Sequence, residues 1–598
     1  MPSSPALRDL RSALGLGLAA GCAEVALRAS PLLGLSAVEQ LAWLGAGAGL
    51  SLALAALLAL PLLVLRSAWP RLPALGLTLG GLIGLQALLW YRLELHVNAF
   101  LREPRLWGGL LAIALLSGLL GWLADRPLRA VGPWTGRTAL LLALAAAVLA
   151  QVRGAPPADA RPVPEGPDVL IVTLDTTRPD ALQPWGAALS TPALQGLADE
   201  GVLFEQAVAS APLTESSHLA MLTGIEPARS GVVANGTDFG AQPALVSHAF
   251  HDAGYATAAF VAGFPLTARW GWSQGFQVFD DDFGAMPGLH NLSVVRAWDQ
   301  LTLPGHTLRE RTADAVLART LPWLARQGER PWFCWVHFFD PHGPYEAPAP
   351  FAPVTPPPRD GAPLALPAYW PPALRSVTST AWLTEAYQAE LRFTDQQLGR
   401  LLDAVRAGQG PRGTLVLVVG DHGESLTEHG YLFDHGDDLY DPSLRVPLIV
   451  AQPVALPAGR RVPCQVSTVD VAATLLGAAG LAATGDGRSL LPLARGDEPC
   501  AERDAFATTV AGRLMERPPL AHALRGHGRK LVAHADGRSE LYALDQDPGE
   551  LVDLAPERPD EARALRTVLE TRVAGAEVQA PAMDAATQEA LRALGYVE

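Results

Sequence analysis

The sequence has few cysteines and fewer basic than acidic residues, and both shortages exclude classes of function. Four cysteines occur among 598 residues, none in the close C-x-x-C spacing of a zinc knuckle, so neither such a site nor a disulfide framework is implied. A pair between Cys464 and Cys500 stays open. Lys and Arg total 45 against 60 for Asp and Glu, which gives a formal net charge of -15. Because nucleic-acid binding needs a clustered basic surface, we expect no nucleic-acid partner.

A change in composition divides the chain near residue 153. The residues before it are rich in Leu, Ala and Gly, whereas almost all Asp and Glu lie beyond Pro156. A helix needs about 20 apolar residues to cross a bilayer. We therefore predict a transmembrane region of about five helices over residues 1–153, with the first and last runs short for a span. The apolar runs cover 12–29, 41–65, 72–91, 106–124 and 137–152.

The arginines that flank these runs predict the orientation. More of them fall on the side of the N-terminus, and positive residues favour the cytoplasmic side. Five spans then place everything after Arg153 outside, so we expect a multi-pass inner-membrane protein with a periplasmic catalytic domain. A cleaved signal peptide would not be followed by four more apolar runs.

Beyond a Pro- and Ala-rich linker at 154–167, predicted strands alternate with helices. The run "DVLIVTLD" (168–175) is apolar, β-branched and ends in a carboxylate, as expected for a buried parallel strand. The alternation predicts a catalytic α/β domain at 168–510 with a central, mostly parallel sheet and functional residues at the carboxyl ends of its strands. The stretch "RKLVAHADGRSELYALDQDPGE" alternates in the manner of short strands, so we expect a small antiparallel subdomain within 511–598.

Ionisable residues follow the first and the last of the predicted strands. Asp175 ends "DVLIVTLD", and Asp421 with His422 ends the strand in "VVGDHGE". Because strand ends of one sheet can converge, two carboxylates and an imidazole form a candidate site for a divalent metal. The alternative is that each residue caps a helix or a turn.

Several segments in order resemble the sulfatase family of the alkaline phosphatase superfamily. They are "VLIVTLDTTRPDALQPWG", "STPALQGLADEGVLFEQAVASAPLTESSHLAMLTGIEPARSGV", "VVGDHGESLTEHG", "RVPLIV" and "ELYALDQDPGE". The resemblance covers most of residues 167–555. It implies an alkaline-phosphatase-like α/β sandwich and metal-dependent ester chemistry, and it leaves the substrate open.

The chain departs from the family at the nucleophile motif. Family sulfatases carry C-x-P-S-R or S-x-P-S-R before Leu-Thr-Gly, and the first residue is oxidised to formylglycine. Counting back from "LTG", Thr214 stands at the nucleophile position, Ser216 at the proline position and His218 at the arginine position. Formylglycine cannot form from threonine.

The sulfate-binding lysines of the family are missing as well. Ala262 and Phe264 stand at the Lys and His positions of the family's G-K-x-H motif, and Lys530, far along the chain, is the only lysine. The two lysines with which family sulfatases bind sulfate therefore cannot both be present.

The metal ligands also differ from the family pattern. Thr176 follows Asp175 where the family has a second carboxylate, and His422 replaces an asparagine after Asp421. Losing a hard oxygen ligand and gaining an imidazole favours Zn²⁺ or Mn²⁺ over Ca²⁺. These positions resemble nucleotide pyrophosphatase/phosphodiesterases, lipoteichoic acid synthases and phosphoethanolamine transferases, which use a metal-bound threonine nucleophile. The resemblance implies that Thr214 shares this metal with Asp175, Asp421 and His422.

Physical chemistry supports Thr214 in this role. Coordination to a divalent ion lowers the pKa of a hydroxyl, and the helix predicted for "SSHLAMLTG" adds its N-terminal dipole. The alternative is that Thr214 or Ser216 only caps this helix.

Histidines in two further segments extend the predicted site. "WVHFFDPHGPY" and "EHGYLFDHG" resemble stretches of the phosphoethanolamine transferases, which implies active-site roles for His337, His342 and His435. Asp340 with His342 and His435 could hold a second metal. Alternatively, the histidines act as general acid and phosphate clamps around one metal. We expect one metal site and leave the second open.

Two further residues are candidates for substrate binding. Asn235 lies as far after Thr214 as the phosphate-binding asparagine lies after the threonine of the pyrophosphatase relatives, although "NG" is also a common turn. Arg178 either clamps an oxyanion or pairs with Asp180.

Together these features predict a membrane-anchored, metal-dependent hydrolase or transferase that acts on a phosphodiester-type ester through Thr214. One alternative is a sulfuric ester hydrolase that works without formylglycine, and another is a non-catalytic binding or scaffold protein. The membrane region suggests a lipid-linked or envelope-polymer substrate by analogy with the transferases. The oligomeric state and the natural acceptor stay open.

Overall fold

The computed structural model describes residues 165–574, apart from 241–242, 282, 284–309, 368–369, 372, 409, 411, 454 and 511–519. The described elements belong to one compact unit, which comprises residues 161–281, 309–583 and 590–598. The five predicted spans lie outside the described residues. Within the described part, no helix combines the length and the apolar character that a membrane span requires.

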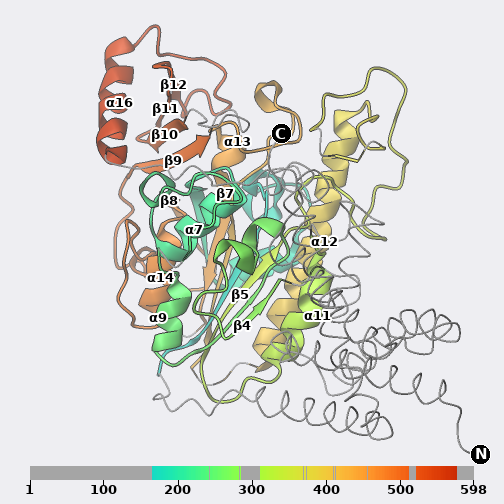
Figure 1. The fold of residues 1–598 in the computed structure, drawn as a ribbon, viewed down its shortest axis with the longest axis vertical. Coiled ribbons are helices and arrows are strands. Elements are labelled where there is room, and N and C mark those ends of the chain that lie inside the picture. Colours follow the sequence, from blue (N-terminus) through green and yellow to red (C-terminus); the bar gives the residue numbers. More distant parts are fainter. Residues whose placement is uncertain are drawn as a thin grey trace, which may run out of the picture. The chain divides into compact units, whose positions relative to one another are not determined.

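A mixed eight-stranded sheet forms the centre of this unit (Figure 1). Its strand order is β4-β3-β5-β1-β6-β7-β2-β8, and β7 alone runs antiparallel to its neighbours β6 and β2. The predicted mostly parallel sheet is therefore confirmed, with β7 as the one antiparallel strand among its described strands. The strands are β1 (Asp168–Leu174), β2 (Val202–Val208), β3 (Ala256–Phe260), β4 (Val278–Asp280), β5 (Trp332–Phe338), β6 (Thr414–Gly420), β7 (Arg445–Ala451) and β8 (Arg460–Ser467).

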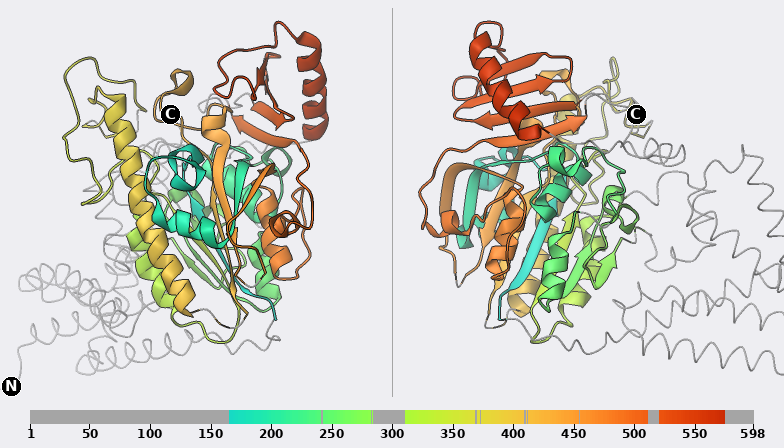
Figure 2. Two further views of the ribbon diagram at one scale, coloured as in Figure 1. Left: turned by 180° about the vertical axis from the view of Figure 1, so that it is seen from behind. Right: turned by 60° about the vertical axis from the view of Figure 1, so that its left-hand side comes forward.

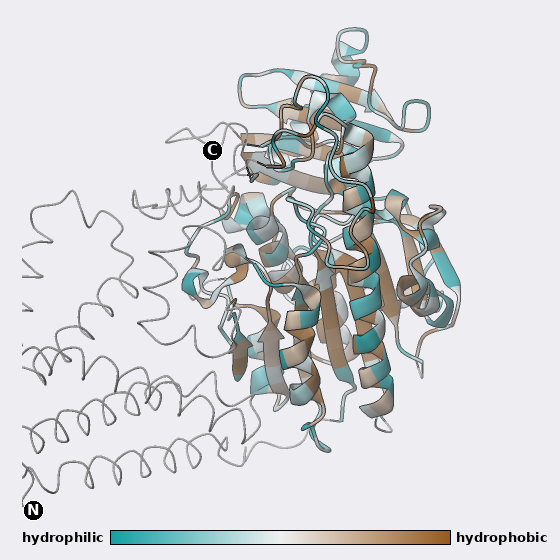
Figure 3. Cartoon of the chain, turned by 90° about the vertical axis from the view of Figure 1, so that its right-hand side faces the viewer, coloured by the Kyte–Doolittle hydropathy of each residue, from teal (hydrophilic) through white to brown (hydrophobic). Residues whose placement is uncertain are grey.

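The burial of the three central strands explains why their sequences are apolar. Every residue of β1, β5 and β6 is buried, because helices cover both faces of a sheet built this way. Figure 3 shows the strands of the central sheet mostly in apolar colours, whereas the helices carry both apolar and polar residues. The pairing aligns the strand ends, since Leu174 at the end of β1 lies opposite Phe338 of β5 and Gly420 of β6.

Helices form a layer on each side of the sheet. Figures 1 and 2 show α11 and α12 on one face and α7, α9 and α14 on the other. The α-helices are α6 (Pro192–Glu200), α7 (Thr214–Thr223), α8 (Pro227–Ser230), α9 (Val246–Asp252), α11 (Ala313–Leu324), α12 (Thr380–Gly408), α13 (Asp441–Leu444), α14 (Asp470–Ala478), α15 (Leu491–Arg495) and α16 (Pro559–Val573). Short 3-10 helices are η3 (Pro179–Ala181), η4 (Gln183–Trp185), η5 (Phe264–Leu266), η6 (Ala268–Trp270) and η8 (Glu428–Gly430).

A small antiparallel sheet follows, as the sequence predicts. It has the order β12-β11-β10-β9 and is covered by α16, drawn in red in Figure 2. Its strands are β9 (Ala505–Val510), β10 (Leu520–Gly526), β11 (Arg529–His534) and β12 (Ser539–Ala543). Because β9 pairs with β10, this sheet begins before the predicted boundary at residue 510.

One disulfide joins Cys464 of β8 to Cys500, a pairing that the sequence left open. Cys334 is a free cysteine buried in β5. Burial raises the pKa of the Cys334 thiol, so this side chain acts as a small apolar core residue.

Candidate active site

The ends of β1 and β6 bring the predicted metal ligands together. Asp175 follows β1, and its backbone N–H donates to Phe338 O of β5. Asp421 follows β6 and donates its N–H to Leu174 O of β1. These ladder bonds extend each strand by one residue, so both carboxylates project from the same edge of the sheet.

The turn after Asp175 fastens the two strand ends to one another. Thr176 has a φ of 46°, a left-handed conformation that is costly for a β-branched residue. In this conformation its N–H donates to Asp421 Oδ1 over 3.2 Å, and its carbonyl accepts the Tyr387 hydroxyl over 2.8 Å. The residue that stands in place of a family carboxylate therefore orients Asp421 through its backbone.

One ligand atom from each of Asp175, Asp421 and His422 lies within 4.8 Å of the other two. His422 Nδ1 lies 2.9 Å from Gly423 O. Because a carbonyl oxygen only accepts, Nδ1 carries the proton and Nε2 of the neutral ring presents its lone pair. That Nε2 lies 3.4 Å from Asp421 Oδ2 and 3.8 Å from Asp175 Oδ1.

The chemistry of this set fits a divalent cation. Asp175 Oδ1 and Asp421 Oδ2 are buried and have no hydrogen-bond partner. Burial raises the pKa of Asp175 well above its usual value, and the neighbouring Asp421 and Glu424 raise it further; burial likewise raises the pKa of Asp421. Two buried carboxylates and an imidazole lone pair match the ligand types of Zn²⁺ and Mn²⁺.

Thr214 begins α7 and faces this set. Its Oγ1 lies 3.4 Å from His422 Nε2, and its hydroxyl acts to lower the pKa of Asp175 against the effect of burial. Every residue of α7 is buried, and the helix directs its N-terminal dipole toward the threonine. The structure thus brings Thr214, Asp175, Asp421 and His422 together, as the sequence predicts.

Asn235 is held against the first turn of α7. Its Oδ1 accepts the Glu215 N–H over 2.8 Å, whereas its Nδ2 is buried without a hydrogen-bond partner. Glu215 returns the contact, because its carboxylate accepts the N–H groups of Gly236 and Thr237. Asn235 is therefore held by Glu215, the residue that follows the candidate nucleophile Thr214, and its Nδ2 group has no hydrogen-bond partner.

His337 orients Asp175. The Ala262 N–H donates to His337 Nδ1 over 3.2 Å, so the ring proton resides on Nε2, which donates to Asp175 Oδ2 over 3.2 Å. Burial lowers the pKa of His337 well below its usual value. The Ala262 position, where family sulfatases have a lysine, therefore contributes its backbone to the orientation of this histidine.

Of the other two predicted histidines, His435 lies beside His422 and His342 lies beside His435. The ring centroids of His422 and His435 are 4.4 Å apart, and the ring centroids of His435 and His342 are 4.9 Å apart. His435 Nδ1 donates to Glu424 Oε1 over 3.2 Å. Glu424, three residues after Asp421 in "DHGE", is a site residue that the sequence analysis did not single out.

Two predicted residues have other contacts. Asp340 accepts the Ala313 N–H with both carboxylate oxygens, at 3.0 and 2.9 Å, and so caps α11; burial raises its pKa to about 7. Arg178 binds both oxygens of Asp180 and also Glu428. Asp340 therefore caps α11 and lies apart from the candidate metal ligands. Arg178 forms the ion pair with Asp180 that was the alternative to an oxyanion clamp.

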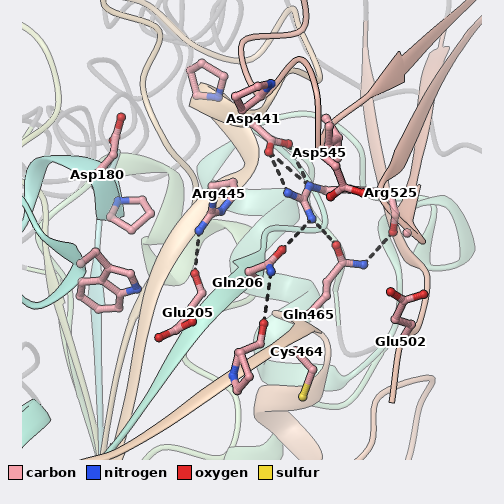
Figure 4. A pocket seen from close by; sticks show the side chains of 18 of the residues that line it. Asp180, Glu205, Gln206, Asp441, Arg445, Cys464, Gln465, Glu502, Arg525 and Asp545 are labelled. Carbon is pink, nitrogen blue, oxygen red and sulfur yellow. Dashed lines mark hydrogen bonds and ion pairs between the residues drawn. The ribbon is translucent and has the colours of Figure 1, made fainter. Parts of the chain in front are cut away.

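A separate cleft of about 860 Å³ lies beside the small sheet (Figure 4). Its described lining includes Arg178, Arg445, Asp441 and Arg525 and contains no member of the metal set. In Figure 4, Arg525 points toward Asp441, Gln206 and Gln465, all within hydrogen-bond distance.

Comparison with known proteins agrees with this fold. Residues 167–481 match the family described as Sulfatase, and residues 427–577 match "N-sulphoglucosamine sulphohydrolase, C-terminal". A choline-sulfatase of Rhizobium meliloti is 27% identical over 470 residues, which cover 71% of this chain and 89% of the relative. Mouse arylsulfatase K is 32% identical over 192 residues, which cover 29% of this chain and 32% of the relative.

Solved structures show the same fold. A phosphonate monoester hydrolase of Agrobacterium radiobacter superposes with a TM-score of 0.55 at 21% identity, over 68% of this chain and 96% of that chain. A second, from Silicibacter pomeroyi, gives a TM-score of 0.52 at 22% identity, over 68% and 95%. Since the Sulfatase match spans more than half of the 598 residues, the chain belongs to the sulfatase family of the alkaline phosphatase superfamily.

Proposed function

We propose that the protein is a metal-dependent esterase of this family that cleaves a phosphodiester-type ester through Thr214. The observation that carries the proposal is the position of Thr214 Oγ1, which lies 3.4 Å from His422 Nε2 at the start of a buried helix. Thr214 occupies the position at which family sulfatases carry the formylglycine precursor, and threonine cannot give that aldehyde.

A divalent metal bound by Asp175, Asp421, His422 and Thr214 would lower the pKa of the threonine hydroxyl and offset negative charge on the reacting ester. Thr214 Oγ then attacks phosphorus, the Oγ–P bond forms, and the bond from phosphorus to the leaving oxygen breaks. The proton of the Thr214 hydroxyl passes to water, and the leaving oxygen gains a proton from the imidazolium form of His342 or His435, which water then reprotonates. Water or an acceptor hydroxyl next displaces the threonine and returns its proton.

Asn235 fits the role of an oxyanion donor in this reaction. Its unpaired Nδ2 lies beside the first turn of α7, where a non-bridging oxygen of an ester attacked by Thr214 would be placed. A donor held in advance needs no rearrangement as charge develops, which is why such groups stabilise transition states effectively.

The test is mass spectrometry of the Mn²⁺-loaded protein after incubation with a p-nitrophenyl phosphodiester and, in parallel, with p-nitrophenyl sulfate. We expect a phosphoryl-type adduct on the peptide that contains Thr214. The adduct should be absent from Thr214→Ala and retained in Thr214→Ser. Sulfate release with an unmodified Thr214 would contradict the proposed nucleophile.

A second candidate activity is sulfate ester hydrolysis without formylglycine. The names of several relatives, including the choline-sulfatase, favour it. The same experiment distinguishes the two activities, because sulfate and phosphoryl adducts differ in their fragmentation and in their dependence on Thr214. If metal-free protein bound substrate analogues as tightly as metal-loaded protein and turned over neither ester, a non-catalytic binding role would be the better account.

We also propose that the catalytic unit is anchored by the apolar region at 1–153 and faces the periplasm, where a lipid-linked or envelope-polymer ester would be its substrate. The Cys464–Cys500 disulfide supports this location, because disulfides persist in oxidising compartments. Added protease should digest the catalytic unit in spheroplasts while a cytoplasmic marker survives. Protection of both would contradict the proposed topology.

A further inference from the structure

His218 makes contacts that locate its ring proton. Its Nδ1 lies 2.8 Å from the backbone oxygen of Thr214 and 3.5 Å from Asp421 Oδ2. A carbonyl oxygen accepts and never donates, so Nδ1 must carry a hydrogen. One side of the ring therefore faces both the residue of the nucleophile and a metal-binding carboxylate.

A second pair of contacts shows that the opposite ring nitrogen, Nε2, accepts a hydrogen bond. His218 Nε2 lies 3.0 Å from Thr173 Oγ1, and the same oxygen lies 3.0 Å from Trp335 Nε1. Indole N–H is only a donor, so Thr173 accepts from Trp335 and directs its own proton to His218 Nε2. The chain of donors thus runs from Trp335 through Thr173 and His218 to the backbone oxygen of Thr214, beside the Asp421 carboxylate.

All five residues of this chain have 0% exposure. Water therefore does not compete for these groups, and each proton position is set by the protein. Ser217 adds a parallel contact, since its hydroxyl donates to the backbone oxygen of Asp421 over 2.6 Å. Two successive residues of α7 thus contact Asp421, which follows β6.

From these contacts we infer that His218 is a positioning residue, which aligns the first turn of α7, and with it Thr214, to the Asp421 carboxylate. The inference rests on the proposed role of Thr214. Outer groups that hold a metal ligand or a nucleophile are needed because reacting atoms must stay in register to within about 0.5 Å. His218 touches no reacting atom and acts through its two neighbours.

Two substitutions at His218 separate its two nitrogens. The amide nitrogen of Asn is as many bonds from Cα as the donor His Nδ1, and the amide oxygen of Gln is as many as the acceptor His Nε2. His218→Asn thus keeps the donor to Thr214, whereas His218→Gln keeps only the contact to Thr173. Gln fills the buried space better than Asn, so a purely space-filling role predicts the opposite order of activities.

We expect His218→Gln to lower kcat by about 10- to 100-fold, the usual effect of losing a partner of a metal ligand, with KM within about threefold of the wild type. His218→Asn should retain most of the activity that His218→Gln loses, although His218→Asn should be the less stable protein. The measurements are steady-state kinetics on the p-nitrophenyl phosphodiester and thermal unfolding of the Mn²⁺-loaded full chain.

Substitutions at Thr173 provide an independent test of the same inference. Thr173→Val removes the hydroxyl that fixes the His218 proton and should lower kcat by about tenfold, whereas Thr173→Ser keeps the hydroxyl and should restore it. Thr320→Val is the matched control, because Thr320 is equally buried in α11 and its hydroxyl bonds only Val316 O. It should cost stability and leave kcat unchanged.

Equal activities of His218→Asn and His218→Gln, or a more active His218→Gln, would overturn the inference, as would full activity of Thr173→Val. If the wild type turned over neither ester, the proposed function would fail by itself. Mn²⁺ affinity, measured by electron paramagnetic resonance, then decides: His218→Gln should bind about tenfold more weakly than His218→Asn, and equal affinities would overturn the role of His218.

Discussion

At the scale of single residues, Asn235 illustrates how one side chain serves two purposes. Its Oδ1 accepts the Glu215 N–H and holds the residue in place, while its Nδ2 is buried with no hydrogen-bond partner. A buried donor without a partner is costly unless something binds it, and a native fold retains such a group where a ligand satisfies it. The unpaired donor beside Thr214 therefore suits an ester oxygen.

We predict that Asn235→Asp lowers kcat by about 10² to 10³, as removal of one oxyanion donor does. Aspartate keeps the acceptor for the Glu215 N–H and loses the Nδ2 donor, so the fold and the metal affinity should change little. Asn235→Ala, which loses both groups, should show the same fall in kcat together with a lower melting temperature. Steady-state kinetics and thermal unfolding check both, and near-wild-type kcat in Asn235→Asp would contradict the role of Nδ2.

At the scale of elements, the first turn of α7 is bound to the 235–237 turn in both directions. Glu215 donates its N–H to Asn235 and accepts the N–H groups of Gly236 and Thr237. Burial raises the pKa of Glu215 well above its usual value, and the two N–H groups lower it only in part. The helix that presents Thr214 and the turn that presents Asn235 therefore behave as one element.

We predict that Glu215→Ala lowers the free energy of unfolding by about 1–3 kcal/mol, because two buried N–H groups lose their acceptor. It should also lower kcat, since Asn235 is no longer held at the start of α7. Asp395→Ala is the matched control: Asp395 is buried and accepts the N–H groups of Ala193 and Leu194 away from the site. Denaturant unfolding and kinetics should show similar losses of stability in both variants and a loss of kcat in Glu215→Ala alone.

At the scale of the whole described unit, a buried ionic cluster joins the small sheet to the end of the large one. Lys530 of β11 is fully buried and lies 2.9 Å from Asp441 and 2.7 Å from Glu550. Arg525 of β10 also binds Asp441, which precedes β7. The chain's only lysine thus has a structural place far in sequence from the predicted metal ligands.

We predict that Asp441→Asn costs about 3–5 kcal/mol of unfolding free energy, since it leaves buried cations short of a counter-charge. Asp403→Asn, which breaks the exposed Asp403–Arg406 pair, is the control and should cost less than about 1 kcal/mol. Denaturant unfolding of the whole chain measures both. Equal effects of the two substitutions would contradict the role of the cluster.

The same cluster predicts how stability depends on pH. Burial raises the pKa of Asp441, but Lys530 and Arg525 outweigh it and hold the pKa below its usual value. A depressed carboxyl pKa contributes stability above the unfolded value, about 4, and this stability is lost as the pH falls below it. Unfolding free energy should therefore fall on acidification in the wild type and fall less steeply in Asp441→Asn, measured by unfolding titrations between about pH 6 and pH 3.

The disulfide acts at this scale too. Cys464 and Cys500 are 36 residues apart, and closing a loop of this length removes chain entropy worth about 3–4 kcal/mol from the unfolded state. We expect reductant to lower the melting temperature of the wild type and to leave that of a Cys464→Ser, Cys500→Ser double variant unchanged. An equal effect on both proteins would contradict a stabilising role.

Much of the fold and the metal set was predictable because the signals are local. Buried parallel strands are continuous apolar runs, so β1 and β6 and the carboxylates at their ends were readable in "DVLIVTLD" and "VVGDHGE". Thr214 was found by its spacing to "LTG", and its place beside His422 agrees with that prediction. The small antiparallel sheet was indicated by its alternation, a pattern of period two.

Other features were decided only by the tertiary structure, because they depend on contacts between residues far apart in the chain. The antiparallel direction of β7 follows from its partners, and Asp340 caps α11 because of where that helix begins. Two of the partners of His218 are 45 residues away at Thr173 and more than 200 away at Asp421, so no spacing rule could reveal them. The sequence by itself determined the central strands, the candidate nucleophile and the candidate metal ligands, because these signals reside in neighbouring residues. The tertiary structure alone decided which groups orient them, because hydrogen-bond partners are chosen by proximity in space.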